Sequence, residues 1–509
     1  MKNRLPNALK QTLLAYIALF SMTAATVPAS GAQGAPSSSI RRSVDAVIPA
    51  LMAKDRIPGM AVAVTDEGKA FIFNYGVASV NPRIPVTGET LFELGSVTKT
   101  FTATLASLAQ VQRRLSLDDS TAKYLPELQG TQFGNVTLLS LGTHTPGGLP
   151  LQFPDDVTNG AQLMQYFEQW RPSYPMGAYR TYSNQGIGML GFIAAKSMGD
   201  DFRSLMQQRL FPALGLQHSF IAVPASERAR YAWGYTDDNT PIRMTTGMLS
   251  DETYGVRTTA ADMIRFVQEN IDPSGLSSAI REAITQTHTG YFRAGPMTQD
   301  LIWEQYPYPV ALKSLLNGNS YQMIFQPTPV DTIVPPQPPM QNAWLNKTGS
   351  TNGFAAYVAF IPSKRLGIVL LANKDYPIPD RVAAAYRILS ALTPVAQASV
   401  KPTVVLQRVS ISGTNRELSM GIAEFPPFSA KPLQMATGPE LCYVLEGEVS
   451  VATERRPRTT YRAGQTFKLP AYVIHQTTAG PKGATVLASW VDAPGEVFNI
   501  PSSQRKNKT

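Results

Sequence analysis

Residues 353–361 read GFAAYVAFI, residues 362–365 read PSKR, and residues 367–371 read GIVLL. The two apolar runs have strand length, and the proline-containing segment between them is typical of a turn. A helix is expected to follow from Pro379, because proline suits a first helical turn. Its apolar stripe would be Val382, Tyr386 and Leu389. These residues therefore predict a strand–turn–strand–helix unit.

The beginning of the chain supplies matching elements. An apolar-periodic helix is predicted around Val44–Leu51, followed by strands at 60–64 and 70–73 with a polar turn between them. Residues 96–330 carry helical patches and long Pro/Gly loops with little strand signal. The economical prediction is an α/β (α+β) fold: one antiparallel sheet built from both chain ends, with an all-helical insertion.

The flanking segments have a different character. Residues 1–32 carry basic residues, a short apolar core and small residues, the order of an export signal, and the core is too short to span a bilayer. Residues 394–402 are predicted to be a linker, 403–498 an all-β sandwich or barrel, and 499–509 a basic tail. The chain is therefore expected to be exported, to the periplasm, with no membrane span.

Charge and cysteine content exclude some functions. The net charge is +9, but six basic residues lie at the two ends: Lys2, Arg4, Lys10, Arg505, Lys506 and Lys508. The body is then only about +3, which implies no nucleic-acid partner. Cys442 is the only cysteine, so no intrachain disulfide forms, and its apolar surroundings indicate a buried, inert thiol.

Three short motifs could carry chemistry. In the first, Ser96 lies near the start of a helix expected over 98–108, and Lys99 follows three residues later on the same face. A lysine at that distance can lower the serine's pKa or take its proton. The plainer interpretation is a helix-capping serine and a surface lysine. Alone, the motif does not decide between them.

The second and third motifs are loop and strand features. Tyr182 and Asn184 follow a Pro/Gly-rich loop, and nearby cations could make the phenol a general base. Lys347-Thr348-Gly349 leads into the strand at 353–361; its cation and hydroxyl could hold a carboxylate, and its glycine allows close approach to the backbone. The plainer interpretations are a core aromatic, a turn asparagine and a routine strand entry.

Order and spacing join the motifs into one pattern that resembles a class C serine β-lactamase. Tyr182 follows Ser96 by 86 residues and Lys347 follows it by 251. The resemblance extends over about 38–393 and includes segments 92–96 (FELGS), 144–152 (HTPGGLPLQ), 254–257 (YGVR), 344–362 and 371–374 (LANK).

The resemblance implies a role for each matching residue. Ser96 would be the acylated nucleophile, with Lys99 and Tyr182 sharing the proton transfers. Lys347 would be the fourth catalytic residue and act on the substrate carboxylate. The substrate-binding residues would be Gln152 and Asn184 at the amide side chain, Tyr254 in the side-chain pocket, Thr348 and Arg381 at the carboxylate end, Gly349, and Ser350, whose N–H would complete an oxyanion hole with that of Ser96. The implied reaction is β-lactam hydrolysis through an acyl-enzyme, without cofactor or metal.

Three positions depart from the family pattern. Pro146 replaces a small residue and Asn352 replaces a glycine. Ile378 replaces an asparagine, which removes a polar group near the carboxylate end while Arg381 is kept. These changes bear on the range of substrates rather than on the chemistry.

The C-terminal segment resembles a cupin. Residues 440–448 and 464–470, followed by His475, match that family's two motifs, but 433–435 read LQM where histidines are usual. Only Glu440 and His475 remain as ligands, fewer than the three or four that a metal needs. A structural or small-ligand barrel without metal is therefore expected, rather than a metal oxygenase.

Two other functions fit the same serine chemistry, since a fold alone does not select an activity. One is an esterase or D-amino-acid peptidase. The other is a sensor that penicillin acylates without turnover, with the barrel as the signalling part. Lys347-Thr348-Gly349 together with Gln152 favours the lactamase over the first, and Tyr182 argues against the second.

Overall fold

A computed structural model describes residues 38–393, 400, 402–427, 429–454 and 456–501. The signal peptide predicted at 1–32 lies outside the described residues, as do 394–399 and 401 of the predicted linker and 502–509 of the predicted tail. None of the helices among the described residues has the length and apolar content needed to cross a membrane.

The first helical segment is broken in two. Helices α1 (Ser38–Asp45) and α2 (Ile48–Asp55) replace the single predicted helix. Pro49 lies in the first turn of α2, where its missing N–H cannot continue the hydrogen bonding of α1. The predicted hairpin is confirmed as β1 (Gly59–Asp66) and β2 (Lys69–Ser79), which pair in antiparallel register.

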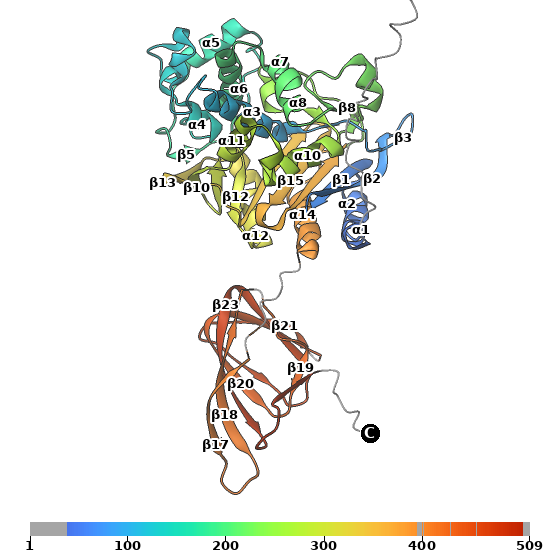
Figure 1. The fold of residues 1–509 in the computed structure, drawn as a ribbon, viewed down its shortest axis with the longest axis vertical. Coiled ribbons are helices and arrows are strands. Elements are labelled where there is room, and N and C mark those ends of the chain that lie inside the picture. The colour runs from blue at the N-terminus through green and yellow to red at the C-terminus, as the bar shows by residue number, and fades with distance from the viewer. Residues whose placement is uncertain (1–37, 394–399, 401, 428, 455, 502–509) are drawn as a thin grey trace, which may run out of the picture. The chain divides into compact units, whose positions relative to one another are not determined.

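The central sheet contains strands from both ends of the domain, as predicted (Figure 1). In the described part of the chain it has 11 strands, in the order β3 (Ile84–Pro85), β2, β1, β16 (Leu366–Ala372), β15 (Phe354–Ile361), β14 (Ala343–Thr351), β12 (Glu304–Pro307), β11 (Met297–Asp300), β10 (Gly290–Ala294), β13 (Thr328–Gln337) and β5 (Tyr179–Arg180). Strand β1 pairs with β16, and β16 with β15, all antiparallel.

Both faces of the middle of this sheet are buried. In β15, Phe354, Ala356 and Val358 belong to one apolar cluster, whereas Ala355 and Tyr357 belong to the cluster on the opposite face. Helix α10 (Ala260–Ile271) covers the first face and α14 (Ile378–Leu392) the second. A strand buried on both sides has no polar face, which explains why its sequence is a continuous apolar run.

The prediction of an all-helical insertion is wrong. Strands β10, β11, β12 and β13 all lie within it and extend the central sheet. These strands are short or rich in proline and polar residues: β11 reads MTQD and β13 reads TPVDTIVPPQ. Several of the polar side chains, including Gln299 and Glu304, are buried and hydrogen-bonded, so apolar periodicity could not reveal the strands.

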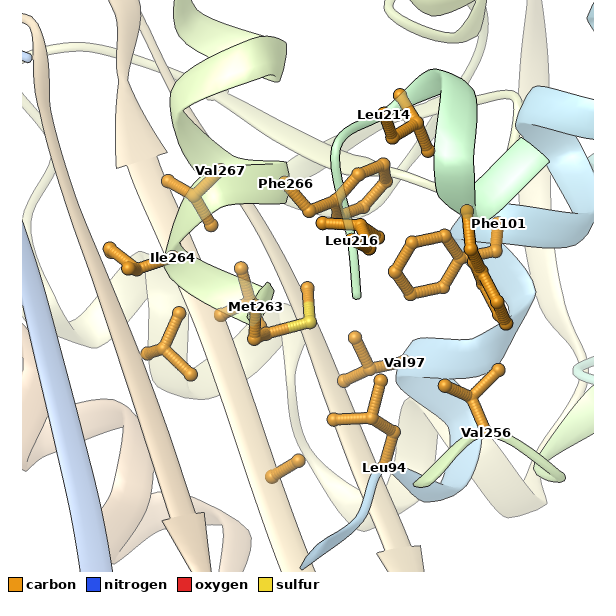
Figure 2. Close-up of a cluster of buried hydrophobic side chains, with 14 of the residues drawn as sticks. Leu94, Val97, Phe101, Leu214, Leu216, Val256, Met263, Ile264, Phe266 and Val267 are labelled. Atoms are coloured by element: carbon orange, nitrogen blue, oxygen red, sulfur yellow. The ribbon is translucent and has the colours of Figure 1, made fainter. Parts of the chain in front are cut away.

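The insertion's helices form the layer beside the site. They include α3 (Thr98–Val111) and α6 (Asn184–Met198), which pack on one another. Phe101 of α3 stacks on Phe266 of α10 with ring centroids 4.1 Å apart. Figure 2 shows Leu94 and Val97, which flank residues 95–96, in the same apolar cluster as Phe101 and Phe266. The segment around Ser96 is therefore anchored in the core on both sides.

Residues 404–501 form an all-β unit, as predicted. Where the structure describes this segment, it has eight strands: β17 (Val404–Ser410), β18 (Glu417–Phe425), β19 (Gln434–Ala436), β20 (Glu440–Thr453), β21 (Arg456–Arg462), β22 (Thr466–Leu469), β23 (His475–Asp492) and β24 (Asn499–Pro501). Thirteen buried residues, Val444, Val486 and Trp490 among them, form a core of its own. The sheet curves into a half-barrel (Figure 1).

Candidate active site

The loop that carries Ser96 packs backbone to backbone against strand β14. Gly95 has φ +53°, and a Cβ there would lie 2.5 Å from the backbone N of Ser350. A Cβ on Gly349 would lie 2.1 Å from the carbonyl O of Leu94 and 2.9 Å from the backbone N of Ser96. Both glycines are thus required by the close approach of two protein segments. This differs from the expectation that Gly349 makes room for substrate.

Lys99 lies directly beneath Ser96. Its Nζ donates a hydrogen bond to Ser96 Oγ at 2.8 Å and another to the carbonyl O of Thr253 at 2.9 Å. Burial lowers the pKa of Lys99 to about 8, with Lys347 lowering it further and Tyr182 opposing both. Lys99 is fully buried, which excludes the surface-lysine interpretation. A lysine in this state can exchange a proton near neutral pH.

Tyr182 is surrounded by cations. Nζ of Lys347, Nζ of Lys99 and Cζ of Arg180 lie 5.0, 5.4 and 5.4 Å from the centre of its ring. Burial alone would raise the pKa of Tyr182, but Lys347, Lys99 and a hydrogen bond to Ser96 outweigh it and bring the pKa to about 8. The phenol is buried, yet its charge environment is that of an acid–base group.

Lys347 belongs to a buried network of ion pairs and hydrogen bonds that the sequence did not predict. Glu304 Oε1 lies 3.6 Å from Lys347 Nζ and 3.3 Å from Nη2 of Arg180, and Asn346 donates to Glu304 Oε2 at 3.1 Å. Arg180 and Asn346 stand within two residues of predicted site residues, which was the available signal. Glu304 lies 43 residues before Lys347 in a short polar strand, and nothing in the sequence pointed to it.

A cleft of about 350 Å³ opens above these groups. Its lining contains nine of the eleven predicted site residues: Ser96, Gln152, Tyr182, Asn184, Tyr254, Lys347, Thr348, Gly349 and Ser350. Lys99 lies below the lining, in contact with Ser96. Among the described residues, the buried Oδ1 of Asn184 accepts no hydrogen bond, which leaves it free for a donor in a bound molecule. Ser183, the N-cap of α6, fixes the position of Asn184 by accepting from Gly186 N at 3.2 Å.

Arg381 does not line the cleft, in contrast to its predicted role in substrate binding. It is buried, and Nη1 donates to the carbonyl O of Gly349 at 2.8 Å and to Ser350 Oγ at 3.1 Å. Nη2 donates to Asp375 Oδ1 at 2.9 Å and to the carbonyl O of Tyr376. The guanidinium therefore positions the strand that carries Ser350. Ile378 and Asn352, two of the departures from the family pattern, do line the cleft.

The two potential metal ligands of the half-barrel, His475 and Glu440, each contact other groups of the barrel. His475 Nδ1 lies 3.1 Å from the carbonyl O of Val473, and its Nε2 lies 3.5 Å from Gln434 Nε2. Glu440 Oε1 accepts a hydrogen bond from the buried thiol of Cys442 at 3.5 Å. Within the described ranges, no three His, Cys, Asp or Glu side chains come together as a possible metal site. The metal-free barrel stays a prediction.

The part of the chain that carries this cleft is similar in sequence to known proteins. The family described as Beta-lactamase matches residues 44–393. A protein named Beta-lactamase from Pseudomonas fluorescens is 48% identical over 353 residues, covering 69% of this chain and 99% of that protein.

Two solved structures are similar over the same part of the chain. One, titled D-alanine Carboxypeptidase AmpC from Burkholderia cenocepacia, is 57% identical with a TM-score of 0.67, covering 69% of this chain and 99% of that one. The other, a class C beta-lactamase in complex with cefoxitin, is 50% identical with a TM-score of 0.67, covering 70% and 99%. Over residues 44–393, this chain belongs to the β-lactamase family, as a member of class C.

Proposed function

We propose that this protein hydrolyses the amide bond of β-lactams through an acyl-enzyme on Ser96. The observation that carries the proposal is the 2.8 Å hydrogen bond between Lys99 Nζ and Ser96 Oγ, below a cleft where Tyr182 and Lys347 meet. Membership of the class C family and a relative that binds cefoxitin support the substrate class.

In acylation, Ser96 Oγ attacks the lactam carbonyl carbon and gives its proton to the pair formed by Lys99 and Tyr182. The C–N bond of the ring then breaks, and the nitrogen takes a proton from the same pair. The backbone N–H groups of Ser96 and Ser350 face the developing oxyanion in this scheme, a contribution of roughly 3–4 kcal/mol per donor. The approach of Ser350 to Gly95 supports the pairing of these two donors.

In deacylation, water attacks the ester carbonyl and the same pair accepts its proton. The depressed pKa values of Lys99 and Tyr182, each about 8, support this shared role. Breaking the ester returns a proton to Ser96 Oγ and releases the opened acid. The protein then needs no metal and no cofactor for the reaction.

The residues that line the cleft around Ser96 and Tyr182 would bind the substrate. The free Oδ1 of Asn184 would accept the N–H of the substrate's amide side chain, with Gln152 beside it and Tyr254 along the pocket wall. Lys347 and Thr348 would hold the carboxylate. Ile378 at that end offers no hydrogen bond, so the carboxylate depends more heavily on these two residues.

The test is nitrocefin hydrolysis by the purified protein and by Ser96→Ala. The variant should lose about 10⁶-fold in kcat, because the other groups act as a unit with the nucleophile. Mass spectrometry with a fluorescent penicillin should show one acyl group on the wild type and none on the variant. Acylation of the variant would contradict the assignment of the nucleophile.

A D-alanine carboxypeptidase is the second candidate, because a 57% identical relative carries that name. Release of D-alanine from an acyl-D-alanyl-D-alanine peptide distinguishes the two activities. A higher kcat/KM for the peptide than for nitrocefin would favour the peptidase. A p-nitrophenyl ester run beside them measures simple esterase activity.

For the flanking parts, we propose cleavage of a signal peptide within 1–32, export to the periplasm, and a cupin-like barrel over 403–498 joined by a linker at 394–402. The order of basic, apolar and small residues supports the first two. The strand-only architecture and the separate core of residues 404–501 support the barrel. Its ligand, if it binds one, would be a small organic molecule.

A further inference from the structure

The C-terminal sheet has one apolar face that is exposed. Along β20, the side chains of Glu440, Cys442 and Val444 are buried, whereas those of Leu441 and Tyr443 on the opposite side are exposed. A strand places alternate side chains on opposite faces, so the inner face forms the core and the outer face is left to solvent. Outward positions are usually polar in a sheet of this kind.

The strand register collects these outward residues into rows. One row across β17, β18, β23 and β20 is Val404, Ile422, Leu487 and Tyr443. The next is Gln407, Met420, Ser489 and Leu441, and the third is Val409, Leu418 and Val491. We call these eleven residues the outer apolar face. None of them is charged, and the exposed Lys468 of β22 adjoins Leu441 at the rim of the face.

The outer apolar face is large. Val404 is 62% exposed, Leu441 59% and Leu418 47%. With about 100 Å² of apolar area per fully exposed large side chain, the face presents roughly 400 Å² per copy. That lies within the range of roughly 300–600 Å² for the largest apolar patch of a typical monomer, and such patches are often functional. Two such faces with their polar neighbours approach the roughly 1,000 Å² that is the lower limit for a specific interface.

Strand β17 adds a second feature. It is the edge strand of the sheet, and all seven of its residues are exposed. A long apolar edge strand favours pairing with another chain unless it is covered or carries charges. Arg408, its only charged residue, lies within ion-pair distance of Glu417 at 3.5 Å and Asp492 at 3.9 Å of its own sheet.

The surface that best matches this face is the same face of a second copy. In residues 38–393, most exposed large hydrophobics lie on separate elements, for example Val80 on a turn, Trp233 on a loop and Val334 in β13. The exception is the stacked pair of Tyr321 and Phe325, and both of these side chains line the cleft. An uncharged, apolar face is complementary to itself, and two-fold association is the commonest solution for identical chains. We propose that two copies of this protein associate through the outer apolar faces of their C-terminal sheets.

The test is sedimentation of the full chain over a range of micromolar concentrations. The wild type should sediment at twice the monomer mass. Leu418→Glu combined with Leu441→Glu should raise the dimer dissociation constant at least about 100-fold, since four carboxylates would lose water without partners. Val334→Glu, at a position 83% exposed in β13, is the matched control and should leave the mass unchanged.

Folding of the double variant is checked by the near-UV difference between the full chain and the chain ending at Gln397, which isolates the contribution of Trp490, buried in the core of the sheet. Independently of any variant, the amides of β17 in the wild type should exchange more slowly as protein concentration rises. A wild type that is monomeric throughout the range would overturn the proposal. So would a folded double variant that remains dimeric, or protection of β17 that does not change with concentration, which would mean that the same chain covers the face.

Discussion

Glu304 balances two buried cations at once: its Oε1 lies 3.6 Å from Lys347 Nζ and 3.3 Å from Arg180 Nη2. Burial alone would lower the pKa of Lys347, but the charges of Glu304 and Tyr182 raise it above the ordinary value. Lys347 therefore stays protonated although its side chain is almost fully buried. The carboxylate that keeps it so comes from β12, a strand that the sequence did not predict.

Glu304→Gln should destabilise the protein by about 3–5 kcal/mol, because two buried cations lose their partner. It should also lower the pKa of Lys347 and so weaken binding of the substrate carboxylate, seen as a higher KM. Urea unfolding and nitrocefin kinetics measure the two effects. The exposed Glu127→Gln is the control. A loss below about 1 kcal/mol would mean that water or relaxation replaces the carboxylate.

Tyr182→Phe should slow nitrocefin hydrolysis by at least about 100-fold, the low end for an acid–base group. The phenyl ring keeps the packing and only the hydroxyl is lost, so thermal stability should change little. Tyr179→Phe, three residues earlier in β5 and outside the cleft lining, is the control. Activity within a few-fold of wild type would contradict the acid–base role and would mean that Tyr182 is only a packing residue of the core.

The pH profile of kcat/KM should have an acid limb near pH 8. Lys99 and Tyr182 both have pKa values of about 8 and act as a coupled pair, so the limb belongs to both. The basic form is present above this pH and is lost as the pH falls. In Tyr182→Phe the limb should move to lower pH, because Tyr182 raises the pKa of Lys99. A limb that does not move would separate Tyr182 from the titrating group.

The sequence predicted the strands whose buried residues are apolar, and it did not predict the strands whose buried residues are polar. Strand β15 is buried on both faces and reads as a continuous apolar run, so it was found from composition. Strand β11 reads MTQD, with Gln299 and Asp300 fully buried, and such polar residues are typical of a loop. Buried polar residues break the apolar pattern on which strand prediction depends.

The candidate site divides in the same way. Ser96, Lys99, Tyr182 and Lys347 were found because they stand in short motifs at family-like spacing, and the structure brings them together. The motif position of Arg381 predicts a direct role in substrate binding, but motif position does not tell which way a side chain points. Its guanidinium faces the backbone of β14 instead of the cleft. Glu304 was missed because a long-range partner leaves no local pattern.

His288 should make the protein acid-sensitive. It is buried, with Nε2 3.0 Å from Asn270 Oδ1, and burial lowers its pKa to about 4 from an ordinary value of 6.5. The unfolded chain binds a proton more readily, so stability is lost as pH falls from about 6.5 to 4, by about 3 kcal/mol for this group. His288→Gln should lose less between these pH values in urea unfolding. At pH 8 both side chains are neutral, so the difference there measures packing alone. Equal losses in variant and wild type would contradict the assignment.

A chain ending at Gln397 should fold and keep its hydrolase activity. The cleft in the described structure is lined by residues between Ser96 and Ile378, and α14 ends at Leu392. Thr393 must be retained, because its Oγ1 accepts a hydrogen bond from Tyr308 at 3.2 Å. Parts with separate cores usually fold alone, so kcat/KM for nitrocefin should stay within about twofold of the full chain.

The same truncation removes the outer apolar face, so it should sediment as a monomer at concentrations where the full chain is a dimer. Ser96→Ala in the truncated chain sets the background for the activity assay. Soluble but inactive truncated protein would show that residues 398–509 contribute to the site. Active truncated protein that still dimerises would locate the association in the catalytic domain and leave the exposed sheet without a partner.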